Sequence, residues 1–129
     1  MGFRVNHVHL KSPDPRGTAH WYVENLGATV TAENKTPSGR TTYRLDLHGL
    51  PLNVTDFVEG QQSAQHYGME HLAVDTDNFE AEVARIKGNG TKVIEERTLP
   101  DGRRVCFFEG PNGVRLEFME MARESTRRG

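Results

Sequence analysis

The chain has 129 residues and a mass of 14.5 kDa, the size of one domain, and its 16 Lys and Arg against 18 Asp and Glu give a net charge of -2. Without excess positive charge it lacks the field that collects phosphate backbones, so we expect no nucleic-acid partner. The single cysteine, Cys106, excludes an intrachain disulfide and a thiolate metal site, and it indicates a reducing, cytoplasmic location. No apolar run approaches the roughly 18 residues of a membrane span, so we expect no membrane partner either.

Strand and helix signals alternate in the first half of the chain. Apolar and polar residues alternate from Val5 to Lys11, and the Ser-Pro-Asp-Pro cluster that follows ends this strand and starts a helix that stops before Gly27. Turn residues then separate three further alternating segments. The pattern predicts the order βαβββ, with a helix over 16–26 and strands over 5–11, 28–33, 41–48 and 50–57.

The second half repeats this order about 64 residues later, because the same shift superposes His7 on His71, Gly49 on Gly113 and Leu52 on Leu116. We expect strands over 67–74, 91–96, 103–109 and 114–121 and a helix from about 78 to 87. The fold class is therefore predicted as α+β, with two tandem βαβββ modules, at about 3–58 and 66–121, that form a curled mixed-sheet cup. Both modules belong to one domain over 1–129, and residues 122–129 form a flexible tail.

Period-two alternation divides each predicted strand into an apolar and a polar face. One helix per module covers only the apolar face, and the opposite face carries imidazoles at equivalent places in both repeats. His7 and His71 are such a pair, and Glu117 and Asn53 each lie 46 residues after one of them. Two imidazoles and one carboxylate in one cavity leave coordination positions for a substrate. We therefore predict one divalent ion on His7, His71 and Glu117, with nickel, cobalt, zinc, manganese and iron(II) all left open.

Several segments resemble the vicinal oxygen chelate superfamily, which includes glyoxalase I, methylmalonyl-CoA epimerase, fosfomycin resistance proteins, bleomycin-binding proteins and extradiol dioxygenases. The resemblance covers residues 3 to about 121, and its segments are Asn-His-Val-His-Leu at 6–10, Trp-Tyr-Val-Glu-Asn-Leu-Gly at 21–27, Glu-His-Leu-Ala-Val at 70–74 and Gly-Pro-Asn-Gly-Val-Arg-Leu-Glu-Phe at 110–118. It implies paired βαβββ modules, often in a homodimer, and it carries metal ligation onto His7, His71 and Glu117.

Two departures from the family pattern bear on the reaction. Asn53 stands where glyoxalase I and the epimerase typically have Glu or Gln, and an amide hydrogen-bonds but does not act as a base near neutral pH. The extradiol enzymes share the ending Pro-x-Gly-x3-Glu but usually have a Tyr where this chain has Phe107.

His9 lies two residues after His7 on the same strand face, about 7 Å away, and is the candidate general base. Asn53 is the second candidate catalytic residue. The candidate substrate-binding residues are those that strand alternation or positive charge favours, namely Arg44, His48, Tyr67, Arg104 and Arg115.

These observations favour a metal-dependent enzyme that binds an oxygen-bearing small molecule, stabilises an enolate and transfers a proton, as a lyase, isomerase or epimerase. An iron(II) ring-cleaving dioxygenase with the same three ligands is one alternative. A metal-free small-molecule or drug-binding protein is the other, although a passive pocket has no need of the two histidines and the glutamate.

Overall fold

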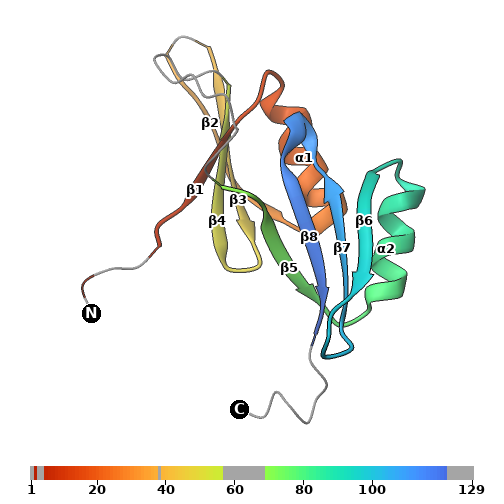
Figure 1. Ribbon diagram of the computed structural model, residues 1–129. Helices are drawn as coiled ribbons and strands as arrows, with labels where there is room; N and C mark the ends of the chain where they lie inside the picture. Colours follow the sequence, from red (N-terminus) through yellow and green to blue (C-terminus); the bar gives the residue numbers. More distant parts are fainter. Residues whose placement is uncertain (1, 3–4, 38, 57–68, 122–129) are drawn as a thin grey trace. The chain divides into compact units, whose positions relative to one another are not determined.

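The computed structural model describes residues 2, 5–37, 39–56 and 69–121, and it divides the chain into two compact units, Met1–Ser63 and Ala64–Gly129. Figure 1 follows the element order along the chain by colour. The first unit contains β1 (Val8–Lys11), α1 (Pro15–Leu26), β2 (Thr29–Lys35), β3 (Thr41–Leu47) and β4 (Leu50–Thr55). The second contains β5 (Leu72–Thr76), α2 (Phe79–Gly88), β6 (Lys92–Thr98), β7 (Arg104–Glu109), the short 3-10 turn η1 (Pro111–Gly113) and β8 (Arg115–Glu120).

Both units therefore have the predicted βαβββ order, and each forms a mixed four-stranded sheet. The strand orders are β1-β4-β3-β2 and β5-β8-β7-β6, and the first pair of strands in each sheet is parallel while the others are antiparallel. Val8 pairs with Leu52 in the first sheet, and 64 residues later Leu72 pairs with Leu116 in the second. The α+β class and the two-module architecture are confirmed.

The hairpins show where the repeat departs from a constant shift. The register irregularity in β2, between Val30 and Ala32, recurs in β6 between Val93 and Glu95, which is a shift of 63 rather than 64. Five residues separate the paired Glu109 and Arg115 at the β7–β8 connection, whereas four separate the equivalent pair Asp46 and Pro51 at the β3–β4 connection, and this one-residue difference accounts for the change of shift.

The helix α1 begins and ends at residues whose side chains suit those positions. The Asp14 carboxylate accepts a hydrogen bond from the Gly17 amide at 3.1 Å, and Pro15 occupies the first turn, where its missing amide costs nothing. Gly27 ends the helix in the left-handed conformation, with φ of 72°. Its amide and that of Ala28 bond back to carbonyls of the last turn.

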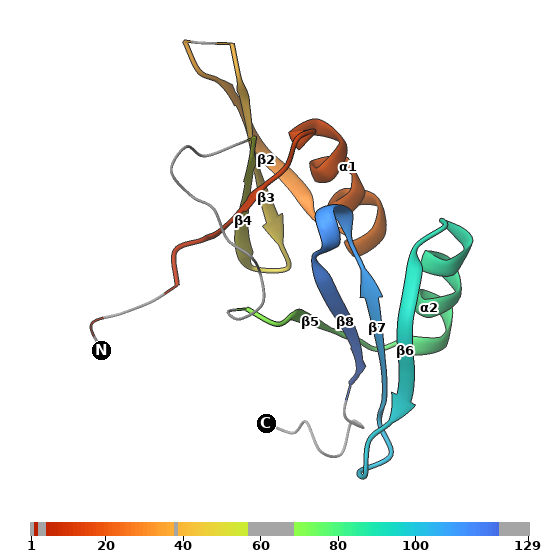
Figure 2. The same cartoon turned by 45° about the horizontal axis from the view of Figure 1, so that its top comes forward.

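Each sheet buries its apolar face. In the first unit Leu45, Leu52 and Val54 are almost fully buried, together with Tyr22 of α1. In the second unit Ile86 of α2 is inaccessible to solvent, as are three strand residues, Cys106, Phe108 and Leu116. Both views show α2 running alongside β6 (Figures 1 and 2). None of the helices in the described part of the chain is long and apolar enough to span a membrane.

Two strands are shorter at their starts than predicted. β1 begins at Val8 and β5 at Leu72, so His7 and His71 each lie one residue before a strand instead of inside it. The nearby apolar residues Val5 and Met69 are 73% and 70% exposed. The alternation of apolar and polar residues in these two segments therefore does not mark a buried strand face. Tyr67, the linker it belongs to (57–68) and the predicted tail at 122–129 lie outside the described residues.

Because the thiol of Cys106 is buried, we expect it to react slowly in the folded protein. Desolvation raises the pKa of this thiol to about 11, so at pH 8 its reactive thiolate is roughly 100-fold scarcer than that of an exposed cysteine. We expect the native protein to react with a disulfide-exchange reagent at least that much more slowly than the chain unfolded in guanidinium. Equal rates in the two states would contradict this burial.

The same shift makes stability depend on pH. The folded state retains a proton that the unfolded chain releases near pH 9, so this contribution to stability is complete below pH 9 and declines as the pH rises through 11. We expect denaturant midpoints to fall between pH 8.5 and 10.5, with a smaller fall in Cys106→Ala. Part of the fall remains in that variant, because burial also raises the pKa of Tyr22 to about 12.

Candidate functional site

The face of the second sheet opposite α2 carries a buried carboxylate. The strand registers place Ala73, Glu117, Phe107 and Glu95 side by side across β5, β8, β7 and β6, so the four side chains share one face. Glu117 is only 7% exposed, whereas ionised side chains are rarely buried without a partner. Its partner therefore decides what this face can do.

That partner is His71. Its Nε2 lies 2.9 Å from Oε1 of Glu117, and its Nδ1 contacts Oε1 of Glu70 on the other side of the ring. The hydrogen bond from His71 lowers the pKa of the Glu70 carboxyl. The ring also packs edge-on against Phe107, with centroids 5.2 Å apart. The imidazole is thus held between two carboxylates and an aromatic face.

Two guanidinium groups lie over the same aromatic ring. Arg115 is 4.7 Å and Arg97 5.7 Å from the centroid of Phe107, both within the range of a cation–π interaction. The Nε of Arg115 is buried and has no hydrogen-bond partner among the described residues, whereas Arg97 forms an ion pair with Glu95 at 3.4 Å. Arg115 was predicted as a substrate ligand. Arg97 was not predicted. It lies two positions after Glu95 on β6, so strand alternation places both side chains on the same face and could have pointed to it.

The first sheet has the equivalent row of side chains. His9, Asn53, Arg44 and Ala32 lie side by side across β1, β4, β3 and β2, so three of the predicted residues of this unit, His9, Asn53 and Arg44, share one face. The Nε2 of His9 is 2.6 Å from the hydroxyl of Thr55. His7 is exposed, and its Nδ1 donates to Oδ1 of the adjacent Asn6 at 2.7 Å.

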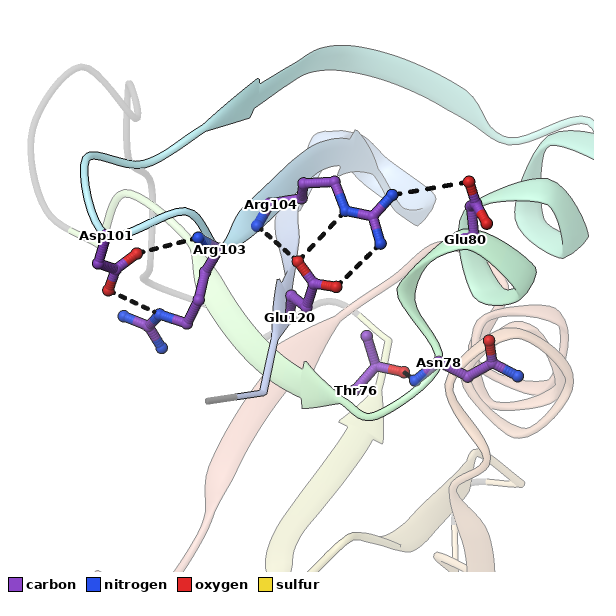
Figure 3. Close-up of polar contacts among 7 residues, drawn as sticks. All are labelled: Thr76, Asn78, Glu80, Asp101, Arg103, Arg104 and Glu120. Carbon is purple, nitrogen blue, oxygen red and sulfur yellow. Dashed lines mark hydrogen bonds and ion pairs between the residues drawn. The ribbon is translucent and has the colours of Figure 1, made fainter. Parts of the chain in front are cut away.

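The structure does not bring Arg104 to the face that carries Glu117. Arg104 lies three positions before Phe107, hence on the opposite face, where its guanidinium forms two hydrogen bonds with the carboxylate of Glu120 and an ion pair with Glu80 (Figure 3). It also lies 5.0 Å from the ring centroid of Phe79, at the start of α2. Its observed contacts join β7, β8 and α2.

His48 lies in the β3–β4 turn instead of in β3, and has a positive φ of 51°. Its Nε2 lies 2.6 Å from the carbonyl oxygen of Leu26, one of the acceptors that the end of α1 leaves without a helical partner. Asn112 holds the equivalent turn position in the second unit and also has a positive φ, of 62°. The contacts of His48 are thus with the helix terminus, and strand alternation failed here because the residue is not in a strand.

The donor set around Glu117 suits a divalent cation. Because Nδ1 of His71 already donates to Glu70, the contact of Nε2 with Glu117 needs either a second ring proton or a cation shared by both atoms. Two donors at right angles, each about 2.1 Å from an ion, lie about 3.0 Å apart, which matches the observed 2.9 Å. No group of three metal-binding side chains is found within the described residues, so His71 and Glu117 are the two predicted ligands that the structure brings together.

The comparison with known families agrees with this architecture. A sequence profile of the Glyoxalase/Bleomycin resistance protein/Dioxygenase superfamily matches residues 4–118. The chain belongs to this superfamily. The predicted membership is thereby confirmed, and the superfamily unites proteins of different activities, so it leaves the reaction of this chain open.

Individual proteins and solved structures also match nearly the whole chain. The uncharacterized protein YwbC of Bacillus subtilis is 26% identical over 93% of this chain and 99% of its own, and the uncharacterized protein YaeR of Escherichia coli is 27% identical over 91% and 95%. A glyoxalase family protein of Enterococcus faecalis matches with a TM-score of 0.73 at 26% identity, over 92% and 98% of the two chains. The fosfomycin resistance protein FosX of Listeria monocytogenes, in a complex with Mn(II), has the same fold, with a TM-score of 0.76 at 17% identity over 98% of each chain.

The contact of His48 with Leu26 generates a stability prediction. We expect His48→Ala to lower the free energy of unfolding by about 1 kcal/mol, the usual net worth of one hydrogen bond, as measured by guanidinium denaturation. His20→Ala on the exposed surface of α1 is the control and should change stability less. An unchanged midpoint in His48→Ala would show that this contact does not secure the helix end.

Proposed function

We propose that this protein is a divalent-metal-dependent enzyme that binds an oxygen-bearing small molecule and catalyses proton transfer, as a glyoxalase-like lyase, isomerase or epimerase. The observation that carries the proposal is the buried carboxylate of Glu117, 2.9 Å from Nε2 of His71. A buried glutamate with an imidazole at that distance is costly as a stabilising ion pair, whereas it is a ready pair of ligands.

His71 and Glu117 hold the cation in this proposal, and His7 is carried over from the sequence as the third ligand. When bound, the divalent cation supplies Lewis acidity that stabilises negative charge on a substrate oxygen. Mn(II) in the FosX complex supports a divalent ion of this kind, although at 17% identity that likeness concerns the fold.

The chain's own groups account for the movement of the proton. His9 is the proposed base, and the hydroxyl of Thr55, 2.6 Å from its Nε2, orients the ring so that the other nitrogen is available to take a proton. Asn53 lies beside His9 in the sheet and offers an amide hydrogen bond to the substrate, without acting as a base.

The aromatic and cationic groups of the second unit suit substrate orientation. The buried ring of Phe107 packs against His71 and supports Arg115 above it, which provides positive charge for an anionic or polar substrate group. Arg44 belongs to the row of His9 and is retained as a second candidate substrate ligand.

Metal binding tests the proposal directly. We expect the wild-type protein to bind Mn²⁺, Co²⁺, Ni²⁺ or Zn²⁺ in a calorimetric titration and to melt at a higher temperature when loaded. Glu117→Gln and His71→Ala should each weaken binding by more than about 100-fold, since loss of a ligand exceeds the 10–100-fold cost of outer-shell changes. The matched controls, Glu82→Gln on α2 and His20→Ala on α1, should bind as the wild type does.

Two different results would contradict the proposed function. Wild-type protein that binds none of these ions or iron(II), in any titration, would overturn the proposal in favour of a metal-free binding protein. Oxygen consumption with catechols, seen only after anaerobic loading with iron(II), would replace proton transfer by ring cleavage.

A further inference from the structure

The imidazole of each of the two repeat-related histidines forms a hydrogen bond with the side chain of the residue immediately before it. Nδ1 of His7 contacts Oδ1 of Asn6 at 2.7 Å, and Nδ1 of His71 contacts Oε1 of Glu70. The two pairs are 64 residues apart, and each directly precedes the first strand of its unit, β1 or β5. The same ring nitrogen is therefore engaged by a side-chain oxygen in both units, with an amide in one and a carboxylate in the other.

This contact determines which ring nitrogen is available as a ligand. Amide and carboxylate oxygens accept hydrogen bonds, so Nδ1 must be the donor in each pair. A neutral imidazole has a single N–H, and placing it on Nδ1 leaves the lone pair on Nε2. In the second unit Nε2 is the nitrogen that faces Glu117 at 2.9 Å.

We propose that Asn6 and Glu70 are positioning residues that fix the Nδ1–H tautomer and the ring orientation of His7 and His71, so that each presents Nε2 to a divalent cation. This inference rests on the proposed function, because it assigns roles toward the same ion. Hydrogen bonds from the non-ligating nitrogen of a metal-bound histidine orient the ring and make the ligand more basic. A carboxylate does this more strongly than an amide, so Glu70 should matter more than Asn6.

Exposure separates this role from a contribution to folding. The Glu70 side chain is 71% exposed and that of His71 is 30% exposed, so their contact adds little to stability. Removal of Glu70 should therefore leave the fold intact while it frees the imidazole to rotate and to change tautomer.

The first arm of the test measures metal binding by the second unit. We expect Glu70→Ala to weaken Cd²⁺ and Mn²⁺ binding by roughly 10–100-fold, the usual cost of losing an outer-shell partner, with the melting temperature of the metal-free protein unchanged. Glu70→Gln keeps an oxygen acceptor of the Asn6 kind and should lose less. Glu80→Ala, an exposed glutamate on α2, is the matched control and should bind as the wild type does.

The second arm identifies the nitrogen. In ¹¹³Cd-loaded protein labelled with ¹⁵N-histidine, scalar coupling to cadmium should appear at Nε2 of His71 in the wild type, and Glu70→Ala should weaken it or shift part of it to Nδ1. In the metal-free protein His7 should carry its proton on Nδ1, and Asn6→Ala should shift that proton toward Nε2.

The outcomes distinguish the two proposals. If the wild-type protein binds neither cadmium nor any of the ions titrated for the proposed function, that function fails, while the tautomer of His7 still reports on Asn6. If the wild type binds cadmium and Glu70→Ala binds it equally well through Nε2, or if cadmium couples to Nδ1 in the wild type, the positioning role is overturned and the metal site stands.

Discussion

The parallel pairing of the first and last strand of each unit is the constraint on which the rest of the structure depends. In the second unit it joins β5 to β8 with Ala73 opposite Glu117, so the strand that follows His71 lies beside the strand that carries the carboxylate. Side chains alternate between faces with a period of two, so a slip of one residue would move Glu117 to the face packed against α2. The buried apolar row of Leu116 and Phe118 prevents that slip, because it would then face solvent. Core packing and site geometry thus have the same origin.

Much of the fold and part of the site were predictable from the sequence. Alternation and turn residues are local signals, so they gave the βαβββ order of both units, and the shift of 64 residues paired His7 with His71 and Asn53 with Glu117. The same signals fail where the chain leaves a strand. His48 is in a turn with positive φ, and Glu70 and Asn6 precede strands, so no periodicity shows what their side chains contact. Arg104 was selected for its charge, although its parity relative to Phe107 placed it on the other face.

The contacts of Arg104 and His48 show how polar residues hold each unit together. Arg104 joins two strands and a helix in the second unit, and His48 joins a turn to the end of α1 in the first. A buried hydrogen bond between the hydroxyls of Ser12 and Thr18 adds a link between the end of β1 and α1. These groups lie near the ends of helices and strands, where backbone atoms lack regular partners, and so a polar residue near a predicted site often has a structural role.

The two repeats differ in charge at two pairs of equivalent positions, where the first carries amides and the second carboxylates. Asn6 and Asn53 in the first unit correspond to Glu70 and Glu117 in the second, so both formal charges at these four positions fall in one copy. In the proposed metal site the two negative charges of the second unit would balance one doubly charged ion, whereas the first unit offers no carboxylate at these positions. The proposal therefore implies one ion per chain, bound on the side of the second unit.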